Sequence, residues 1–222
     1  MVKISKLIRA KRKTLSIMVM PNGEVVVKAP IGLSDEKIYA FLEEKQKWIT
    51  TKQAKIETNN NRFSDVISYK KVMYLGKIYT GIFTDNVSKI TLGDNYLYVP
   101  AKYNTDKINK KLISWYKKQA ETVLITRTTQ ISEQVYIKPT MVKITDSRGR
   151  WGACNNKHQI FLNWRCIMLP PHLLDYVIVH ELSHILELNH SPKFWAIVNK
   201  ILPDSSKRKA EMKNYGFLLK MF

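Results

Sequence analysis

Hydrophobic and polar residues alternate in the first part of the chain. Residues 14–30 (TLSIMVMPNGEVVVKAP) keep this period of two on both sides of Pro21-Asn22-Gly23, and therefore predict a β-hairpin with a tight turn. Over residues 33–57 the apolar positions take helical spacing instead, and Ser34 stands where it could cap the first turn. The polar run NNNRFSD that follows predicts a linker.

The rest of the chain changes repeatedly between strand-like and helix-like patterns. Residues 72–85 and 87–100 predict strands, 105–135 predict a long amphipathic helix that Thr105 could cap, and 140–147 and 159–164 predict two further strands. Helices are expected from Pro170-Pro171, from Ser191-Pro192 and from near residue 206. The expected fold class is α+β, with a β-rich region carrying a helix at 1–104 and a second region at 105–222.

Residues 176–190, YVIVHELSHILELNH, hold three of the chain's five histidines. Successive helical residues turn by about 100°, so His180 and His184 would face one point and could act as two ligands of a metal ion such as Zn²⁺. Glu181 lies beside the first histidine and could take a proton from a water molecule that the metal activates. Apolar residues fill most other positions, as in a buried helix with one polar stripe, which favours a metal site over two chance histidines.

Catalytic zinc sites usually have a third protein ligand. His190 is the leading candidate, but an unbroken helix would carry it too far away, so the helix must end first. Asn189 tolerates the left-handed backbone that ends helices, and Ser191-Pro192 favours a new helix start. Glu187 is the alternative, because it lies close to the same helical face and could bind the ion, hold a histidine or pair with a lysine. We expect His190 to be the ligand.

Lysine and arginine number 37 against 18 aspartate and glutamate residues, a formal charge of +19. Such a charge attracts nucleic acid, nucleotides and other anions, yet the basic residues are spread along the chain rather than gathered in an arm. Cys154 and Cys166 lack the spacing of a metal motif and favour a reducing, cytoplasmic setting. No run has the length and character of a membrane span or a signal peptide, so neither is expected.

Arg148 and Arg150 stand in a loop at residues 148–158. An arginine there could bind a substrate carboxylate or phosphate, or stabilise an oxyanion, because its planar fork donates two parallel hydrogen bonds. The alternative is a structural ion pair for Arg150, with Trp151 packed against the metal-site helix. Residues 160–164, IFLNW, could similarly be a substrate-binding edge strand or only a core strand.

Taken together, RWGAC, IFLNW, YVIVHELSHILELNHSPKFW and the LP that follows resemble the YgjP-like metallopeptidase family. The resemblance extends upstream through YLGKIYTGIF and LISWYKKQAETVL, and so covers nearly the whole chain. It implies a zincin-like catalytic half, in which strands pack on the helix bearing His180, Glu181 and His184, and His190 completes the site. It also implies a hydrolase, expected to be a peptidase. Ala153 departs from the family's usual serine in RWGSC.

The predicted activity is zinc-dependent hydrolysis of peptide bonds. Zn²⁺ held by His180, His184 and His190 would activate water and polarise the scissile carbonyl, with Glu181 as the general base. Two alternatives arise from the positive charge: hydrolysis of an anionic substrate such as a nucleoside triphosphate, and a nucleic-acid-binding protein with an associated metal site. The expected partner is a peptide or protein substrate, with a nucleotide or nucleic acid as the alternative.

Overall fold

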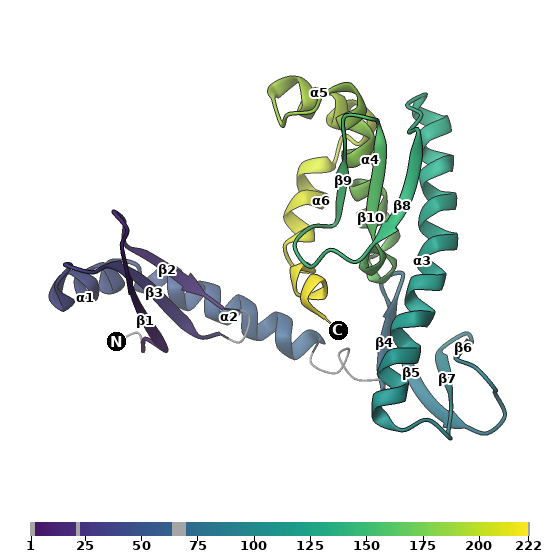
Figure 1. Cartoon of the computed structure of the whole chain (residues 1–222), viewed down its shortest axis with the longest axis horizontal. Coiled ribbons are helices and arrows are strands. Elements are labelled where there is room, and N and C mark those ends of the chain that lie inside the picture. Colours follow the sequence, from purple (N-terminus) through teal and green to yellow (C-terminus); the bar gives the residue numbers. More distant parts are fainter. Residues whose placement is uncertain (1–2, 21–22, 64–69, 222) are drawn as a thin grey trace. The chain divides into compact units, whose positions relative to one another are not determined.

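The computed structural model describes residues 3–20, 23–63 and 70–221 (Figure 1). Its internal contacts divide the chain into two compact units, Met1–Asp65 and Val66–Phe222. Strands and helices occur in both units, which confirms the predicted α+β class. The turn expected at Pro21-Asn22 lies outside the described residues.

The first unit contains one three-stranded sheet. Its strands β1 (Lys6–Ala10), β2 (Ser16–Val19) and β3 (Val25–Pro30) have the order β1-β3-β2. Strands β2 and β3 pair antiparallel, as the predicted hairpin requires, and β1 pairs parallel with β3. Strand β3 is therefore the central strand, and its first three residues, Val25, Val26 and Val27, are all buried.

The helix predicted at 33–57 is two helices, α1 (Asp35–Glu44) and α2 (Gln46–Phe63). They are separated at Lys45, whose φ of −93° and ψ of 4° leave the helical region. Helix α2 also continues to residue 63, through part of the polar run expected to be a linker. Apolar residues of both helices and of β3 form the core of this unit: Val25, Val27, Ala29, Ile38, Leu42 and Ile49.

The second unit contains two sheets. The first has the order β4-β5-β7-β6, formed by β4 (Lys71–Tyr74), β5 (Lys77–Thr84), β6 (Thr91–Leu92) and β7 (Tyr96–Pro100). The second has the order β8-β10-β9, formed by β8 (Met141–Thr145), β9 (Gly152–Cys154) and β10 (Gln159–Asn163). Because β10 lies between two strands, IFLNW begins in a core strand, and β9 forms one of the two edges of this sheet.

The helices of the second unit surround these strands. They are α3 (Thr105–Val135), η2 (Trp164–Met168), α4 (Pro171–Leu186), α5 (Pro192–Ile201), α6 (Ser205–Met212) and η3 (Gly216–Lys220). Helix α3 begins at the predicted residue, but Asn104 rather than Thr105 caps it, because the Asn104 side chain accepts a hydrogen bond from the Lys107 N–H. The guanidinium of Arg127 pairs with both carboxylate oxygens of Asp175, at 2.7 and 2.8 Å, and joins α3 to α4.

The β4–β5 turn attaches the first of these sheets to the rest of its unit. The N–H groups of Leu75 and Gly76 donate to the carbonyls of Ile167 and Met168, at 2.8 and 3.1 Å. The Tyr116 hydroxyl of α3 donates to the carbonyl of Met73 at 2.8 Å. Residues 71–100 therefore belong with the second unit, whereas the sequence places a boundary between 104 and 105.

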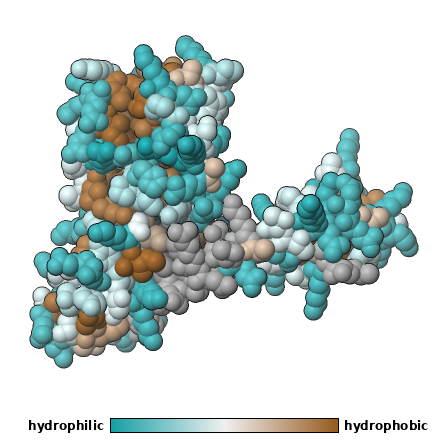
Figure 2. All heavy atoms as spheres, turned by 180° about the vertical axis from the view of Figure 1, so that it is seen from behind, coloured by the Kyte–Doolittle hydropathy of each residue, from teal (hydrophilic) through white to brown (hydrophobic). Residues whose placement is uncertain are grey.

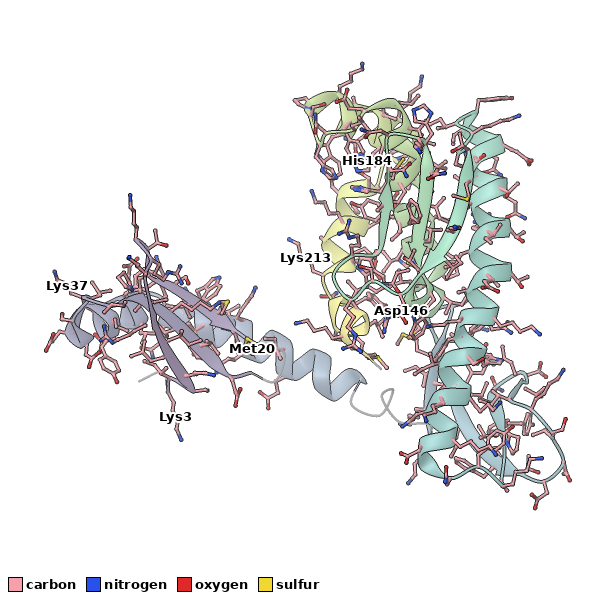
Figure 3. All side chains as sticks on the ribbon, viewed as in Figure 1. Lys3, Met20, Lys37, Asp146, His184 and Lys213 are labelled. Carbon is pink, nitrogen blue, oxygen red and sulfur yellow. The ribbon has the colours of Figure 1, made fainter. Side chains whose placement is uncertain are left out.

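A buried arginine ties the end of the described chain to the β8–β10–β9 sheet. Arg165 is 1% exposed, and its Nε and Nη2 atoms donate to the carbonyl of Met221 at 3.0 and 2.9 Å. Its Nη1 atom donates to Asp146 at 2.6 Å, at the end of β8. In Figure 3, Asp146 lies near the middle of this unit and His184 in its upper part.

The surface is predominantly hydrophilic on the face drawn in Figure 2, where hydrophobic residues form separate areas. This agrees with a chain in which 37 residues are lysine or arginine. No helix in residues 3–20, 23–63 and 70–221 has both the length and the hydrophobicity of a membrane span.

Candidate metal centre

Helix α4 carries the three polar side chains expected from the motif. The rings of His180 and His184 lie one turn apart, with centroids separated by 4.9 Å, and Glu181 is 5% exposed. Leucine, isoleucine and valine occupy most of the other positions, and most of these residues are buried. The helix is thus fixed by its apolar faces, so the orientation of its polar stripe is fixed with it.

His190 approaches the same point because α4 ends before it. The helix stops at Leu186, Glu187 takes an extended backbone, and α5 restarts with the Ser191 hydroxyl accepting a hydrogen bond from the Phe194 N–H. The connection brings His190 Nε2 to 3.0 Å from His180 Nε2. Asn189, expected to end the helix in the left-handed region, does not have the required positive φ, so that reason for the ending is wrong although the ending itself occurs.

One nitrogen atom from each of the three histidines lies within 4.8 Å of the other two. His184 Nδ1 lies 3.1 Å from the carbonyl of Glu187, and because a carbonyl only accepts, Nδ1 carries the proton and Nε2 keeps its lone pair. Glu187 contributes this carbonyl, whereas its carboxylate lies 3.9 Å from Lys193 Nζ. The described residues thus place His190, and not the Glu187 side chain, in the cluster.

The environment of His180 and His190 favours their neutral forms. Burial, with smaller contributions from the neighbouring histidines and Lys209, lowers the pKa of His180 to about 3, and the same causes lower the pKa of His190. His180 Nδ1 is buried without a hydrogen-bond partner among the described residues. Neutral imidazole is the form that binds metals, and the three converging imidazole rings fit a divalent ion that prefers nitrogen ligands.

Aromatic side chains of α5 enclose this cluster. Phe194 is fully buried and stacks on His184, with ring centroids 4.4 Å apart. Trp195 stacks on His190, with centroids 5.8 Å apart, and Lys209 Nζ lies 3.9 Å from the centre of its ring. Phe194 therefore belongs to the core, whereas Trp195 is only half-buried and forms part of the site.

Glu181 projects toward β9. Burial raises the pKa of its carboxyl to about 8, and the charge of Arg150 only partly opposes this. A Cβ atom at Gly152 would lie 2.6 Å from Glu181 Oε1 and 2.7 Å from its Cγ, so glycine is needed where β9 meets α4. The edge of the sheet thereby reaches the candidate general base directly.

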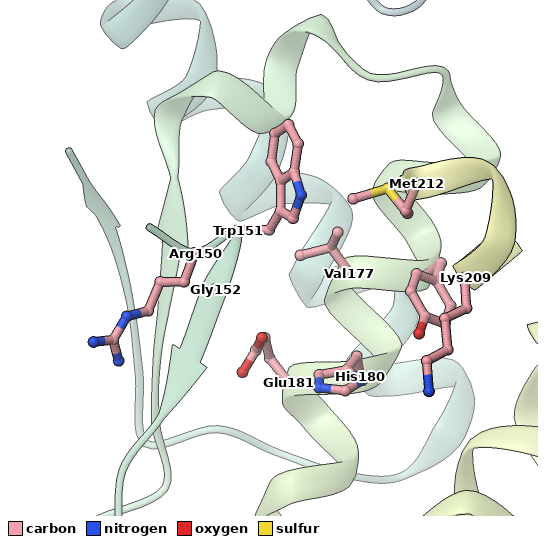
Figure 4. A pocket seen from close by; sticks show the side chains of 9 residues that line it. Arg150, Trp151, Gly152, Val177, His180, Glu181, Lys209 and Met212 are labelled. Atoms are coloured by element: carbon pink, nitrogen blue, oxygen red, sulfur yellow. The ribbon is translucent and has the colours of Figure 1, made fainter. Parts of the chain in front are cut away.

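A cavity of about 330 Å³ opens beside His180 and Glu181 (Figure 4). Its wall is apolar at Trp151, Val177 and Met212. It is positively charged at Arg150 and Lys209. In the figure these two cationic side chains lie on opposite sides of Glu181 and His180.

The two arginines predicted to bind substrate differ in position. Arg150 lines the cavity, whereas Arg148 is not among the lining residues. The Asn163 side chain donates to the carbonyls of Ser147 and Arg150, the latter at 3.0 Å, and so fixes the loop that carries both arginines. Lys209 was not predicted, because a single lysine among many carries no sequence signal until α6 folds against α4.

A family model described as YgjP-like, metallopeptidase domain, matches residues 13–215 of the chain. Among solved structures, the chain is similar to the crystal structure of the metallopeptidase zymogen of Pyrococcus abyssi abylysin, with 18% sequence identity and a TM-score of 0.37. That similarity covers 40% of this chain and 90% of the other. No curated protein matches the chain.

Proposed function

The chain belongs to the YgjP-like metallopeptidase family, and on that premise we propose that it is a zinc-dependent peptidase in which Glu181 acts as the general base. The observation that carries the proposal is the convergence of His180, His184 and His190 on one point beside the buried Glu181. The family implies a metal ion and a peptide or protein substrate. The nucleotide and nucleic-acid alternatives suggested by the positive charge therefore receive no support.

We assign His180, His184 and His190 as the zinc ligands. A bound zinc ion would polarise the scissile carbonyl, acidify the attacking water and, through its charge, favour the ionised form of Glu181. His184 is held for this role by its hydrogen bond to the Glu187 carbonyl, which orients the ring and fixes its tautomer.

Glu181 would accept the proton of the attacking water and return it to the leaving amine. Its contact with Gly152 fixes the carboxylate between α4 and β9, so little reorganisation is needed for this transfer. The position of β9 at the edge of its sheet supports a peptide substrate, because an extended peptide can add to such an edge as a further strand.

We also propose Arg150 as a substrate-binding residue. It lines the cavity next to Glu181, and its guanidinium could contact a carbonyl oxygen of the substrate or stabilise an oxyanion. A role for Arg148 stays a prediction, since Arg148 does not line that cavity.

The proposal is tested with the Glu181→Gln variant of the zinc-loaded protein and a mixed peptide library read by mass spectrometry. Loss of the base should reduce cleavage by about 10²- to 10⁴-fold while the zinc content stays the same. A chelator should abolish cleavage by the unmodified protein, and added zinc should restore it. Cleavage that survives in Glu181→Gln would remove this residue from the mechanism.

Glu187→Gln is the matched control, since it changes a carboxylate six residues away on the same stretch of chain. We expect it to keep the zinc content and most of the cleavage, because Glu187 contacts His184 through its backbone carbonyl. If Glu187→Gln lost zinc, the assignment of His190 as the third ligand would have to be revised.

A further inference from the structure

Lys209 is a positive charge held close to the candidate metal ligands. It lies on α6, and its Nζ atom lies 3.9 Å from the centre of the Trp195 ring, which itself stacks on His190. Lys209 lines the same cavity as His180 and Glu181. Figure 4 shows the side chain reaching from α6 toward His180, along the wall of the cavity.

No carboxylate neutralises this lysine within the described residues. The two acidic side chains nearest in sequence have other partners: Asp204 pairs with Arg208 at 2.9 Å, and Glu211 contacts His172 at 2.9 Å. A cation–π contact holds the ammonium in place but leaves its charge uncompensated. A cation beside a divalent metal site opposes metal binding, so its position indicates a function that uses the charge.

The chemistry of the cavity indicates what the charge would meet. Trp151, Val177 and Met212 form an apolar wall, and a volume of about 330 Å³ is sufficient for a side chain or the end of a peptide. Arg150 and Lys209 also line the cavity and bring positive charge to it from opposite sides of Glu181 and His180. The cavity is therefore complementary to a group that is part apolar and part anionic.

We propose that Lys209, positioned by Trp195, binds a carboxylate of the substrate and makes the enzyme select peptides that carry one next to the scissile bond. This inference rests on the proposed peptidase function and names its substrate class. The carboxylate has two possible sources, the C-terminus of a peptide or the side chain of an aspartate or glutamate. The first source would make the enzyme a carboxypeptidase, and the second an endopeptidase with acidic specificity.

A binding experiment tests the proposal without relying on catalysis. The probes are acetylated pentapeptides that carry glutamate or glutamine at the fourth position, each with a free or an amidated C-terminus. Their binding to zinc-loaded Glu181→Gln is measured by calorimetry. We expect the peptide with glutamine and an amidated end to bind about 10-fold more weakly than the best carboxylate peptide, as a charge-assisted hydrogen bond would give. Comparison of the two singly charged peptides identifies the source of the carboxylate.

Substitution of Lys209 should remove this preference. Lys209→Met in the same background should bind all four peptides as weakly as the neutral one, and Lys209→Arg should restore the preference. Lys207→Met is the matched control, because it removes the same charge from the exposed surface of the same helix. Equal zinc content and equal melting temperatures establish that the variants are folded. A carboxylate preference that persists in Lys209→Met would overturn the proposal.

Cleavage assays separate this proposal from the peptidase function. If the unmodified protein cleaves carboxylate and neutral peptides equally well, the peptidase function stands and the role of Lys209 is wrong. If it cleaves no peptide while the Lys209-dependent binding is observed, carboxylate recognition stands and the peptidase function fails. A uniform fall in kcat for all peptides in Lys209→Met, with KM unchanged, would assign Lys209 to the transition state instead and also overturn the proposal.

Discussion

At the scale of single residues, the candidate site depends on a glycine, Gly152, as much as on its histidines and glutamate. Gly152 allows β9 to lie directly against Glu181, because any Cβ atom would overlap the carboxylate. The sequence RWGAC places this glycine in a loop between predicted strands and gives no indication that its neighbour is Glu181, twenty-nine positions later. A close approach of this kind results from tertiary packing and not from local pattern.

Gly152→Ala should displace Glu181 while leaving the histidines in place. Since a shift of about 1 Å in a catalytic group can cost about 10²-fold in rate, we expect a loss of that order in kcat/KM with unchanged zinc content. Gly149→Ala is the control, because nothing lies within 4 Å of a Cβ atom there. Kinetic and metal analyses of the two variants make the comparison. Full activity in Gly152→Ala would contradict the described contact.

The two candidate ligands on α4 could be predicted from the sequence, because the geometry of a helix determines how their side chains are placed. His180, Glu181 and His184 follow from one helical turn, and the structure brings all three to one place with His190. The position of the helix end could not be predicted as well, since α4 stops at Leu186 and not at Asn189. Lys209 could not be predicted at all, because its relation to the site exists only after α6 packs on α4.

At the scale of elements, the patterns identify most strands and helices but not how they are connected in space. The hairpin of the first unit, the long helix α3 and the proline-initiated helices α4 and α5 agree with the sequence. The interruption at Lys45 and the central position of β10 do not follow from periodicity. Periodicity reports which faces of an element are buried, whereas the order of strands depends on long-range contacts.

The β4–β5 turn shows how strongly such contacts constrain one residue. Gly76 has a φ of +78°, and a Cβ atom there would lie 2.8 Å from the Cα of Pro170, just before α4. Gly76→Ala should therefore lower the free energy of unfolding by about 2 kcal/mol, through backbone strain and overpacking together. Denaturant unfolding measures this value, with Gly216→Ala as the control at a position with open space. Equal stability of both variants would show that the turn moves freely away from Pro170.

At the scale of the whole molecule, each unit has its own core. The apolar cluster of the first unit comes from β3, α1 and α2, and every candidate ligand, cavity residue and aromatic neighbour described above belongs to the second. The sequence analysis divides the chain between residues 104 and 105, yet the β4–β5 turn is hydrogen-bonded to η2 through Leu75 and Gly76. The composition of the chain does not show to which of two units a sheet belongs.

A fragment of residues 66–222 should fold by itself and bind one zinc ion. The reason is that the contacts that position His180, His184 and His190 all lie within this unit. Metal analysis and thermal unfolding with and without zinc check the expectation, since a ligand that binds only the folded state raises its melting temperature. A fragment that is unfolded in the presence of zinc would show that the first unit is needed for the fold.

The two hydrogen bonds from Arg165 to the Met221 carbonyl also determine when this part of the core can form during protein synthesis. The two residues are 56 positions apart, so at roughly 5–20 residues per second the ribosome needs roughly 3 to 11 seconds to add the second after the first. During that interval the guanidinium lacks the carbonyl that satisfies two of its donors, and burying it would be costly. The nascent chain must therefore keep this corner of the core open to water until Met221 has been added.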